Sequence, residues 1–393
     1  MPMLHWNIQA QKVRRRDDGS LERKPPKDRP ICYAAHKDAA IYGYYGQLLA
    51  AAYESKIRGV GITDCVTAFR ESCKRCNIDF AQEAFEWIGQ KGECTALAFD
   101  IKGFFDNLDH TILKAQWCRV LGTDHLPEDH YAVFRSLSKF AFVDRAAVFR
   151  EFGISAQNPR ANQRKRICSP LEFRERVRGK HLVQTNTSCK GIPQGSPMSA
   201  VLSNIYMWDF DVAVAQHIQA AGGLYRRYCD DMLCVVPLDK ERETEDFVLA
   251  EIQKVKLEVQ GEKTKRHHFR IEGGKLSADE PLQYLGFIFD GHRTLLRTAS
   301  VARYYRKMRA AVRLAVQTKR KADAVRAEHG EAKEPLKRRK LNIRYSYVGR
   351  HNFISYAIRA AKKMVEPAIR RQVKSHWKKL NAEVEKAQAR TGS

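Results

Sequence analysis

Long apolar runs are missing from this chain of 393 residues, since none reaches the roughly 18 residues that a membrane helix needs. The sequence also shows no secretory signal ahead of its ten cysteines. Cysteines in that setting are expected to stay reduced, because disulfides persist in secreted proteins and are rare in the cytosol. We therefore expect a soluble, cytoplasmic protein with no membrane partner.

Metal ligands at regular spacing are also scarce. Cys73 and Cys76 form one C-x-x-C pair, and Cys65 lies nearby in the sequence. A structural zinc site usually has a second such pair or histidines at ligand spacing, and the sequence offers neither. Buried free thiols are the better interpretation of these cysteines.

Acidic residues are few compared with basic ones. The chain has 70 Lys and Arg against 45 Asp and Glu, which gives a net charge of +25. This excess is larger than solubility requires, and it predicts a nucleic-acid partner. A membrane-surface interpretation would need one basic amphipathic helix, whereas here the charge is spread through the whole chain.

The sequence does contain two adjacent carboxylates between short apolar runs. The runs at residues 224–225 and 233–236 predict the strands of a hairpin, with Asp230 and Asp231 at its tip. Neighbouring side chains on extended backbone point to opposite faces, so the two carboxylates are not expected to do identical work. An ordinary Asp-Asp turn is the alternative interpretation.

A third carboxylate follows another apolar run. Residues 95–99 predict a strand that ends at Asp100 and would deliver this side chain to the hairpin tip. Three converging carboxylates repel one another, and a divalent cation such as Mg²⁺ relieves that repulsion. Two such ions about 3.5 to 4 Å apart promote in-line displacement at phosphorus, so the pattern predicts nucleotidyl transfer.

A loop rich in glycine and proline spans residues 190–197. Ser196 or Pro197 is expected to open the helix that follows. The free N–H groups and positive dipole of a helix N-terminus suit a nucleotide triphosphate. A plain connection between loop and helix is the alternative.

Taken in order, five motifs closely resemble those of bacterial reverse transcriptases, in the branch related to group II intron enzymes. The resemblance covers roughly residues 25 to 295 and rests on residues 99–110, 191–197, 227–231, 261–264 and 284–287. It implies an α+β right-hand polymerase: fingers and a palm with an antiparallel sheet and helices, then a helical thumb. It also implies RNA-directed DNA synthesis with two Mg²⁺ ions, dNTP substrates, an RNA template and a cDNA product.

The resemblance further implies a role for each matching residue. Asp100, Asp230 and Asp231 would be the catalytic carboxylates, and with Ile101 they would hold the metal. Phe105 would exclude a ribose 2′-hydroxyl and so select deoxynucleotides. The other expected contacts are Arg29, Gln194, Gly195 and Lys263 for the nucleotide, and Tyr284, Leu285, Gly286 and Phe287 as the primer grip. A solvated arginine before a proline is the alternative for Arg29.

The same resemblance divides the chain. We expect a basic N-terminal arm at 1–28, either flexible or in contact with RNA, fingers at 29–95, the first catalytic palm strand at 96–122, a fingers/palm insertion at 123–189, palm at 190–296 and thumb at 297–393. Helices are predicted at residues 36–58, 81–88, 111–121, 198–220 and 245–257, with three more in the thumb.

Two basic regions remain ambiguous in the sequence. In the insertion we expect the phenylalanines to be mainly core, while the arginines between residues 160 and 178 either contact the template or form plain surface. In the thumb, the charge run either grips a nucleic-acid duplex or is a solvated helix face.

Compact stand-alone enzymes of this kind most resemble the bacterial defence-associated reverse transcriptases, formerly an unknown group, and in particular their second class. That resemblance implies a cognate structured non-coding RNA as template and a role in antiphage defence. No obligate protein partner is evident in the sequence. The alternatives are a retron enzyme, a compact group II intron-type enzyme, or a non-catalytic RNA-binding scaffold, because similarity of fold does not fix function.

Overall fold

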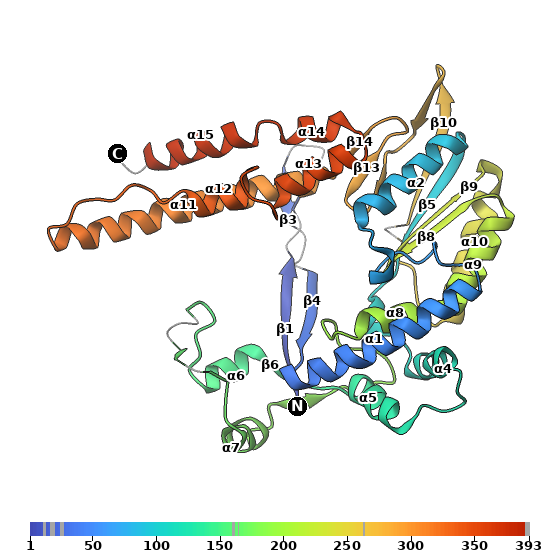
Figure 1. Cartoon of the computed structure of the whole chain (residues 1–393), viewed down its shortest axis with the longest axis horizontal. Coiled ribbons are helices and arrows are strands. Elements are labelled where there is room, and N and C mark those ends of the chain that lie inside the picture. Colours follow the sequence, from blue (N-terminus) through green and yellow to red (C-terminus); the bar gives the residue numbers. More distant parts are fainter. Residues whose placement is uncertain are drawn as a thin grey trace. The chain divides into compact units, whose positions relative to one another are not determined.

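The computed structural model describes residues 1–10, 13–15, 20–23, 27–158, 162–163, 165–261 and 264–389. The chain divides into two units. Unit 1 comprises Met1–Arg70, Phe99–Cys234 and Arg242–Thr264, and unit 2 comprises Glu71–Ala98, Val235–Glu241 and Lys265–Ser393. Both contain helices and strands, as predicted for an α+β chain (Figure 1).

In unit 1, a four-stranded sheet joins the N-terminal residues to the predicted insertion. Its order is β4-β1-β6-β7. The strands are β1 (Met3–Ala10), β4 (Lys27–Tyr33), β6 (Ala141–Asp144) and β7 (Val183–Thr185). A flexible arm was one of two options for residues 1–28, and it is wrong for β1, which pairs antiparallel with β4 and parallel with β6. Apolar and polar residues alternate along much of β1, which is the period of a strand.

One face of this sheet carries a small core of its own. Val143, Val148, Phe152 and Val177 are buried together between the sheet and helices α6 (Arg145–Glu151) and η3 (Phe173–Arg178). The expectation that the phenylalanines are core is confirmed for Phe134 and Phe152, whereas three others are only half-buried: Phe140, Phe142 and Phe149.

The longer helices that lie wholly or mainly in unit 1 largely follow the prediction, except over residues 128–138, where no helix was predicted. They are α1 (His36–Gly59), α4 (His110–Leu121), α5 (Glu128–Ser138), α8 (Ser199–Tyr206), α9 (Trp208–Ala220) and α10 (Glu241–Lys254). Helix α4 ends where expected, at Gly122, whose φ of 72° is easily adopted by glycine. The single helix predicted over 198–220 is instead two helices that meet at Met207.

A second sheet has the strand order β11-β10-β5-β9-β8. Its strands are β5 (Cys94–Asp100), β8 (Leu224–Tyr228), β9 (Asp231–Val236), β10 (Lys265–Glu272) and β11 (Lys275–Ala278). Strands β5 and β9 are buried along most of their length and have residues in both units. The predicted strand before Asp100 and the predicted Asp230 hairpin are therefore confirmed.

Unit 2 combines a small sheet with the C-terminal helices. The sheet is β12 (Leu282–Tyr284), β13 (Phe287–Phe289) and β14 (Thr294–Leu296), and α2 (Asn77–Lys91) contributes Phe85, which stacks on Phe289. The helices are α11 (Thr298–Glu328), α12 (Arg339–Tyr345), α13 (Phe353–Lys363), α14 (Pro367–Val373) and α15 (His376–Ala389). Within the described residues these are five helices, so the prediction of three is wrong. Helices α11 and α15 run side by side (Figure 1).

Short elements complete the described chain: β2 (Val13–Arg15), β3 (Leu21–Arg23), η1 (Glu71–Cys73), α3 (Phe104–Asn107), α7 (Pro170–Glu172) and η4 (Leu238–Lys240).

Candidate active site

The strand end that carries Asp100 lies against the hairpin turn that carries Asp230. The N–H of Ile101 donates to the C=O of Asp230 at 3.1 Å. The main chains of residues 100–101 and 230 are therefore neighbours within unit 1. The side chains of Asp100 and Asp230 are both partly exposed. The structure thus brings together the two carboxylate-bearing segments that the sequence predicted to converge.

Another segment pairs with the end of β5. The N–H of Gln260 donates to the C=O of Asp100 at 2.8 Å, and the N–H of Lys102 donates to the C=O of Glu258 at 2.9 Å. This short antiparallel contact holds residues 258–260 beside Asp100. Lys263, for which a nucleotide contact was predicted, lies outside the described residues.

The hairpin turn gives its two aspartates different surroundings. Cys229 and Asp230 alone connect β8 to β9, and Cys229 has a left-handed φ of 60°. Outside glycine such a φ is uncommon, and it costs on the order of 1–3 kcal/mol. Asp230 is partly buried, whereas Asp231 is exposed. Burial, and then the charge of Asp230, raise the pKa of the Cys229 thiol, so this neighbour of the carboxylate stays protonated.

An ion pair lies buried behind the turn, and the sequence analysis did not single it out. Arg227 and Asp211 are both fully buried, with Nε–Oδ1 and Nη2–Oδ2 distances of 2.7 and 2.6 Å. Burial alone would lower the pKa of Arg227, but the charge and hydrogen bonds of Asp211 raise it above its ordinary value. The sequence carried no signal for this pair, because Arg227 is one of two adjacent arginines in β8 and Asp211 lies on a different element, α9.

Three of the residues expected to contact the nucleotide lie together: Phe105 on α3, and Gln194 and Gly195 in the loop that precedes α8. We call these residues, with Asp106 and Ile192, the loop cluster. The C=O of Phe105 accepts a hydrogen bond from the N–H of Ile192 at 2.9 Å. The side-chain amide of Gln194 donates to Oδ1 of Asp106 at 3.2 Å. The structure therefore brings Phe105 together with Gln194 and Gly195, although Phe105 is far from these two neighbours in the sequence.

Strand β4 lies against this cluster. The N–H of Cys32 donates to the C=O of Gln194 at 2.8 Å. Gly195 has a φ of 105°, and a Cβ added there would lie 2.7 Å from the C=O of Cys32, so the close approach requires glycine. Burial, and then the charge of Asp106, raise the pKa of Cys32 to about 11. Arg29 is exposed on the same strand, so the structure carries it on an element that touches the cluster.

The residues expected to form the primer grip lie in unit 2. Leu285 and Gly286 form the two-residue turn between β12 and β13, with φ values of 45° and 92°. Positive φ at both turn positions is typical of a type I′ hairpin. The flanking side chains, Tyr284 and Phe287, are buried, and the side-chain amide of Asn77 donates to the C=O of Leu285 at 3.0 Å.

The donors at the predicted metal site suit a hard cation. Asp100, Asp230 and Asp231 offer carboxylate oxygens, which Mg²⁺ prefers. Ile101 can offer only its main-chain carbonyl, because its side chain is apolar and buried. Among the residues that the structure describes, however, no group of three or more His, Cys, Asp or Glu side chains is placed to hold a metal ion. The donor chemistry fits, but the three carboxylates are not gathered as a ligand set.

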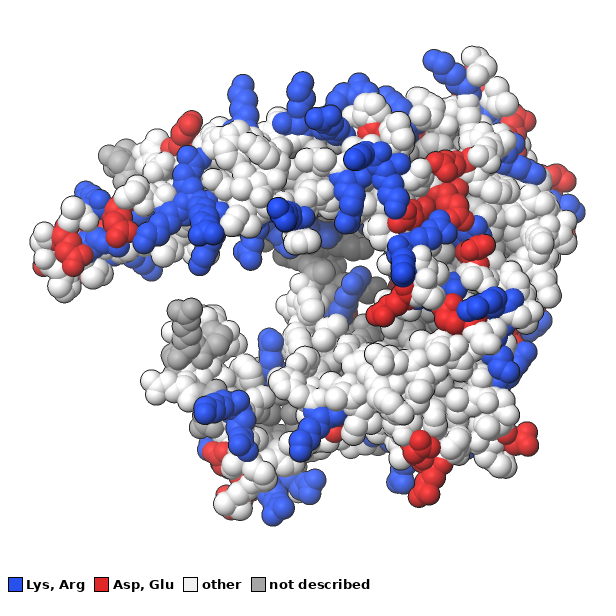
Figure 2. Space-filling view, viewed as in Figure 1, with Lys and Arg blue, Asp and Glu red and all other residues white. Residues whose placement is uncertain are grey.

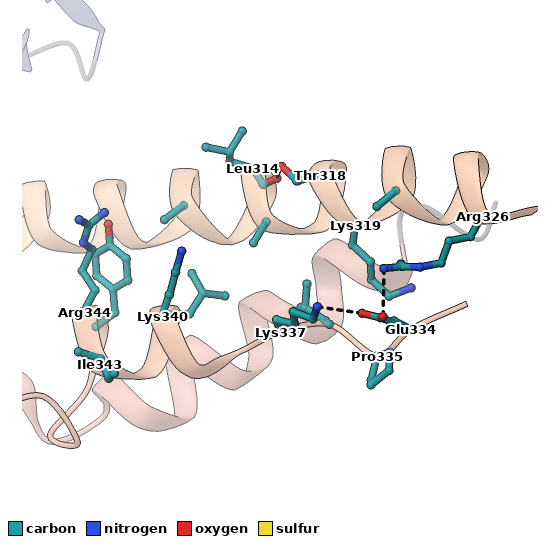
Figure 3. Close-up of a pocket in the computed structure, with 16 residues that line it drawn as sticks. Leu314, Thr318, Lys319, Arg326, Glu334, Pro335, Lys337, Lys340, Ile343 and Arg344 are labelled. Carbon is teal, nitrogen blue, oxygen red and sulfur yellow. Dashed lines mark hydrogen bonds and ion pairs between the residues drawn. The ribbon is translucent and has the colours of Figure 1, made fainter. Parts of the chain in front are cut away.

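A basic surface covers the C-terminal helices. Figure 2 shows Lys and Arg side chains along the helical part of unit 2. On α11 the exposed cations are Arg303, Arg306, Lys307, Arg309, Arg313, Arg320 and Lys321. Between α11 and α12 lies a groove in which Glu334 pairs with Arg326 at 3.1 Å and with Lys337 at 3.0 Å (Figure 3). Lys340 and Arg344 add further positive charge to the lining of this groove.

Residues 65–289 match the family model described as reverse transcriptase (RNA-dependent DNA polymerase). The match covers more than half of the chain and includes β5, the Asp230 hairpin and the loop of Gln194. The chain belongs to the reverse transcriptase family. The predicted class, a right-hand polymerase, is therefore confirmed. No curated protein sequence matches the chain.

The chain is also similar to solved telomerase structures from two Candida species. The Candida tropicalis apo telomerase truncated from its C-terminal domain is 11% identical, with a TM-score of 0.45; 75% of this chain and 57% of that one are covered. The Candida tropicalis apo telomerase is 11% identical, with a TM-score of 0.43; 98% of this chain and 66% of that one are covered. The Candida albicans telomerase in complex with a TWJ fragment of telomeric RNA is 10% identical, with a TM-score of 0.45; 97% of this chain and 55% of that one are covered. This chain thus spans between 55% and 66% of the length of these proteins.

Within the described ranges, no helix combines the length and the apolar character needed to cross a membrane.

Proposed function

We propose that this chain is an RNA-directed DNA polymerase that adds deoxynucleotides to the 3′ end of a primer. One observation carries the proposal. The hydrogen bond from Ile101 to the C=O of Asp230 joins the strand that ends in Asp100 to the turn that carries Asp230 and Asp231. The segment lies inside the region that matches the reverse transcriptase family.

The three aspartates would hold the metal ions, together with the main-chain carbonyl of Ile101. When bound, two Mg²⁺ ions would activate the primer 3′-hydroxyl and stabilise the departing pyrophosphate. Asp230 and Asp231 would divide this work unequally, since one is partly buried and the other exposed.

The loop cluster beside strand β4 would bind the incoming nucleotide. Phe105 would close the pocket against a ribose 2′-hydroxyl, and Gln194 with Gly195 would pack against the nucleotide. Arg29 would pair with the triphosphate, because a guanidinium binds phosphate oxygens in a bidentate manner. The hydrogen bond between Cys32 and Gln194, which ties β4 to the loop, supports this grouping. Lys263 would add a further positive charge.

The remaining roles concern the nucleic acid. The turn at Leu285 and Gly286, with Tyr284 and Phe287, would position the primer end. The basic helices α11 to α15 would grip the RNA–DNA duplex, since phosphate contacts provide much of the affinity for nucleic acid. The exposed arginines and lysines of α11 support this role.

Asp230→Ala tests the polymerase proposal directly. Purified wild type should extend a DNA primer on an RNA template with Mg²⁺ and dNTPs, and the variant should lose at least about a thousandfold in rate. Asp124→Ala is the matched control, because Asp124 is an exposed aspartate of the same unit. Full synthesis by Asp230→Ala would refute the catalytic role of Asp230, and no synthesis by the wild type would leave a non-catalytic RNA-binding scaffold.

The biological role we propose is antiphage defence with a cognate structured non-coding RNA as template. The basis is the Tyr-Cys-Asp-Asp tip at residues 228–231, which resembles that of the defence-associated bacterial enzymes. Sequencing of the RNA and DNA bound to the protein in its host separates the alternatives. One dominant local RNA with complementary DNA, lost in Asp230→Ala, fits defence. DNA that stays covalently linked to its RNA fits a retron, and intron RNA fits an intron-type enzyme.

A further inference from the structure

We infer that Arg227 is a positioning residue for the turn that carries Asp230 and Asp231, and that Asp211 holds Arg227 in place. The inference rests on the proposed polymerase function and extends it to two residues that lie behind the carboxylates. Neither residue would touch substrate. Both would act through the main chain of the turn.

The guanidinium of Arg227 is fixed on one side by a buried carboxylate. Its Nε and Nη2 atoms donate to the two oxygens of Asp211, at 2.7 and 2.6 Å, and both side chains are fully buried. The hydroxyl of Tyr225 donates to the same carboxylate at 2.8 Å. Asn204 accepts a hydrogen bond from Nη1 of Arg227 at 3.3 Å. With its planar fork held in this way, Arg227 has one orientation.

The same guanidinium reaches the turn. Nη1 of Arg227 donates to the C=O of Cys229 at 3.1 Å. Cys229 is the residue with the left-handed φ of 60°, a conformation that persists only where the surroundings impose it. The next carbonyl, that of Asp230, accepts the N–H of Ile101. A continuous series of contacts therefore runs from Asp211 through Arg227 and the turn to the end of β5.

The main chain at Arg227 is held independently of its side chain. Its N–H donates to the C=O of Cys65 at 2.7 Å, and its C=O accepts hydrogen bonds from both the N–H and the hydroxyl of Thr67, each at 2.9 Å. These contacts fix the main chain of β8 just before the turn without help from the guanidinium. The side chain is then left to fix the turn itself.

Stability alone gives a weak reason for a buried ion pair here. Replacing such a pair by apolar residues of similar volume is often neutral or stabilising, because the pair loses its hydration on burial. What an apolar pair cannot do is donate a hydrogen bond to the carbonyl of Cys229. The directional contact with the turn is therefore the property that only this arrangement provides.

A second ion pair in unit 1, which is partly buried, offers a matched control. Arg70 binds Glu54 with the same bidentate geometry, at 2.6 and 2.7 Å. Arg70 also donates to a main-chain carbonyl, that of Val66, at 2.7 Å. Its hydrogen bonds with Glu54 and with the Val66 carbonyl lie outside the turn formed by Cys229 and Asp230. The two arginines differ in what they position.

The test compares Arg227→Lys with Arg70→Lys in primer extension on RNA. Lysine keeps the charge opposite each carboxylate but lacks the fork, so it cannot bind Asp211 and the Cys229 carbonyl together. We expect Arg227→Lys to lower kcat by about 10- to 100-fold, because small misplacements of reacting groups have effects of this size. The KM for dNTP should change less than about twofold. The Mg²⁺ concentration for half-maximal rate should rise, whereas Arg70→Lys should leave both kcat and the Mg²⁺ requirement near wild type.

The double variant Asp211→Leu with Arg227→Met removes the donor without leaving a buried charge. The unpaired Tyr225 hydroxyl and Asn204 oxygen should lower its melting temperature by a few degrees, while the folded variant loses kcat as Arg227→Lys does. Wild-type kcat in either folded variant would overturn the inference, as would equal losses of kcat in Arg227→Lys and Arg70→Lys. A failure of the proposed function itself looks different, because the wild type would then make no DNA.

Discussion

The side-chain amide of Gln194 donates a hydrogen bond to the carboxylate of Asp106 at 3.2 Å. This contact orients an amide that the proposed function uses against the incoming nucleotide. Asp106→Ala should therefore raise the KM for dNTP by about three- to tenfold, the effect expected for one lost hydrogen bond, with a smaller change in kcat. Steady-state primer extension at varied dNTP concentration measures both constants.

Asp106→Asn is the control for that prediction. The amide keeps one acceptor oxygen for Gln194 and removes the negative charge near Cys32. A KM close to wild type in Asp106→Asn would assign the effect to the hydrogen bond. An unchanged KM in Asp106→Ala would mean that Gln194 does not depend on Asp106.

Phe105 is half-buried in the loop cluster, beside Phe104, with ring centroids 5.5 Å apart. If its ring blocks a ribose 2′-hydroxyl, Phe105→Ala should increase the use of ribonucleotides relative to deoxynucleotides by about tenfold or more. Competition between a dNTP and the matching rNTP measures this ratio. Phe140→Ala, at another half-buried phenylalanine of unit 1, should leave it unchanged. No gain of ribonucleotide use in Phe105→Ala would exclude the gate.

Gly195 adopts a φ of 105° and lies against the main chain of β4. In Gly195→Ala the new methyl group would meet the Cys32 carbonyl at 2.7 Å, so we expect unit 1 to lose about 1–3 kcal/mol of stability and synthesis to fall. Gly43→Ala is a control in which we expect the stability to change in the opposite direction. Gly43 lies in α1 with open space around it, and alanine there should stabilise by about 0.5–1 kcal/mol. Urea unfolding measures the free energy of unfolding of both variants. Equal values for the two variants would contradict the prediction.

Local patterns predicted much of the fold. The buried run before Asp100, the apolar strands around Asp230 and the glycine that ends α4 each have a short-range signal, and each element forms where expected. The motif order also identified residues that meet only in the folded chain, such as Phe105 and Gln194. A separation of nearly ninety residues does not by itself predict a contact between Phe105 and Gln194. That prediction came from the resemblance to the family.

The rest depended on long-range contacts. Asp211 lies on α9 among apolar residues, and nothing near it in the sequence marks Arg227 as its partner. Strand β1 is stable because it pairs with β4 and β6, the latter from the predicted insertion, so its alternating pattern was ambiguous without those partners. The C-terminal helices break at points such as residue 346, where no proline or glycine announces the end of α12. Pairing and packing between distant residues decided these features.

The last prediction concerns pH and a histidine held between two carboxylates in unit 2. Nδ1 of His268 lies 2.6 Å from Asp279, and Nε2 lies 2.7 Å from Glu241, which also accepts from Thr95 and lies 3.7 Å from Arg266. The hydrogen bond with Asp279 raises the pKa of His268 above 6.5, and Glu241 adds to that rise. A raised folded pKa contributes stability that is fully present below the unfolded value near 6.5. That stability is lost as pH rises through the folded pKa.

We therefore expect the free energy of unfolding of unit 2 to fall by about 1 kcal/mol as pH rises from below 6.5 to above the folded pKa of His268, in urea titrations at fixed ionic strength. His268→Gln should remove that loss. His267 is the internal control, because burial lowers its pKa and its contribution must have the opposite sign, being lost as pH falls. His267→Gln should thus still lose stability as pH rises through the folded pKa of His268, as the wild type does. If His268→Gln and wild type show the same pH dependence, the two carboxylates do not stabilise a charged His268.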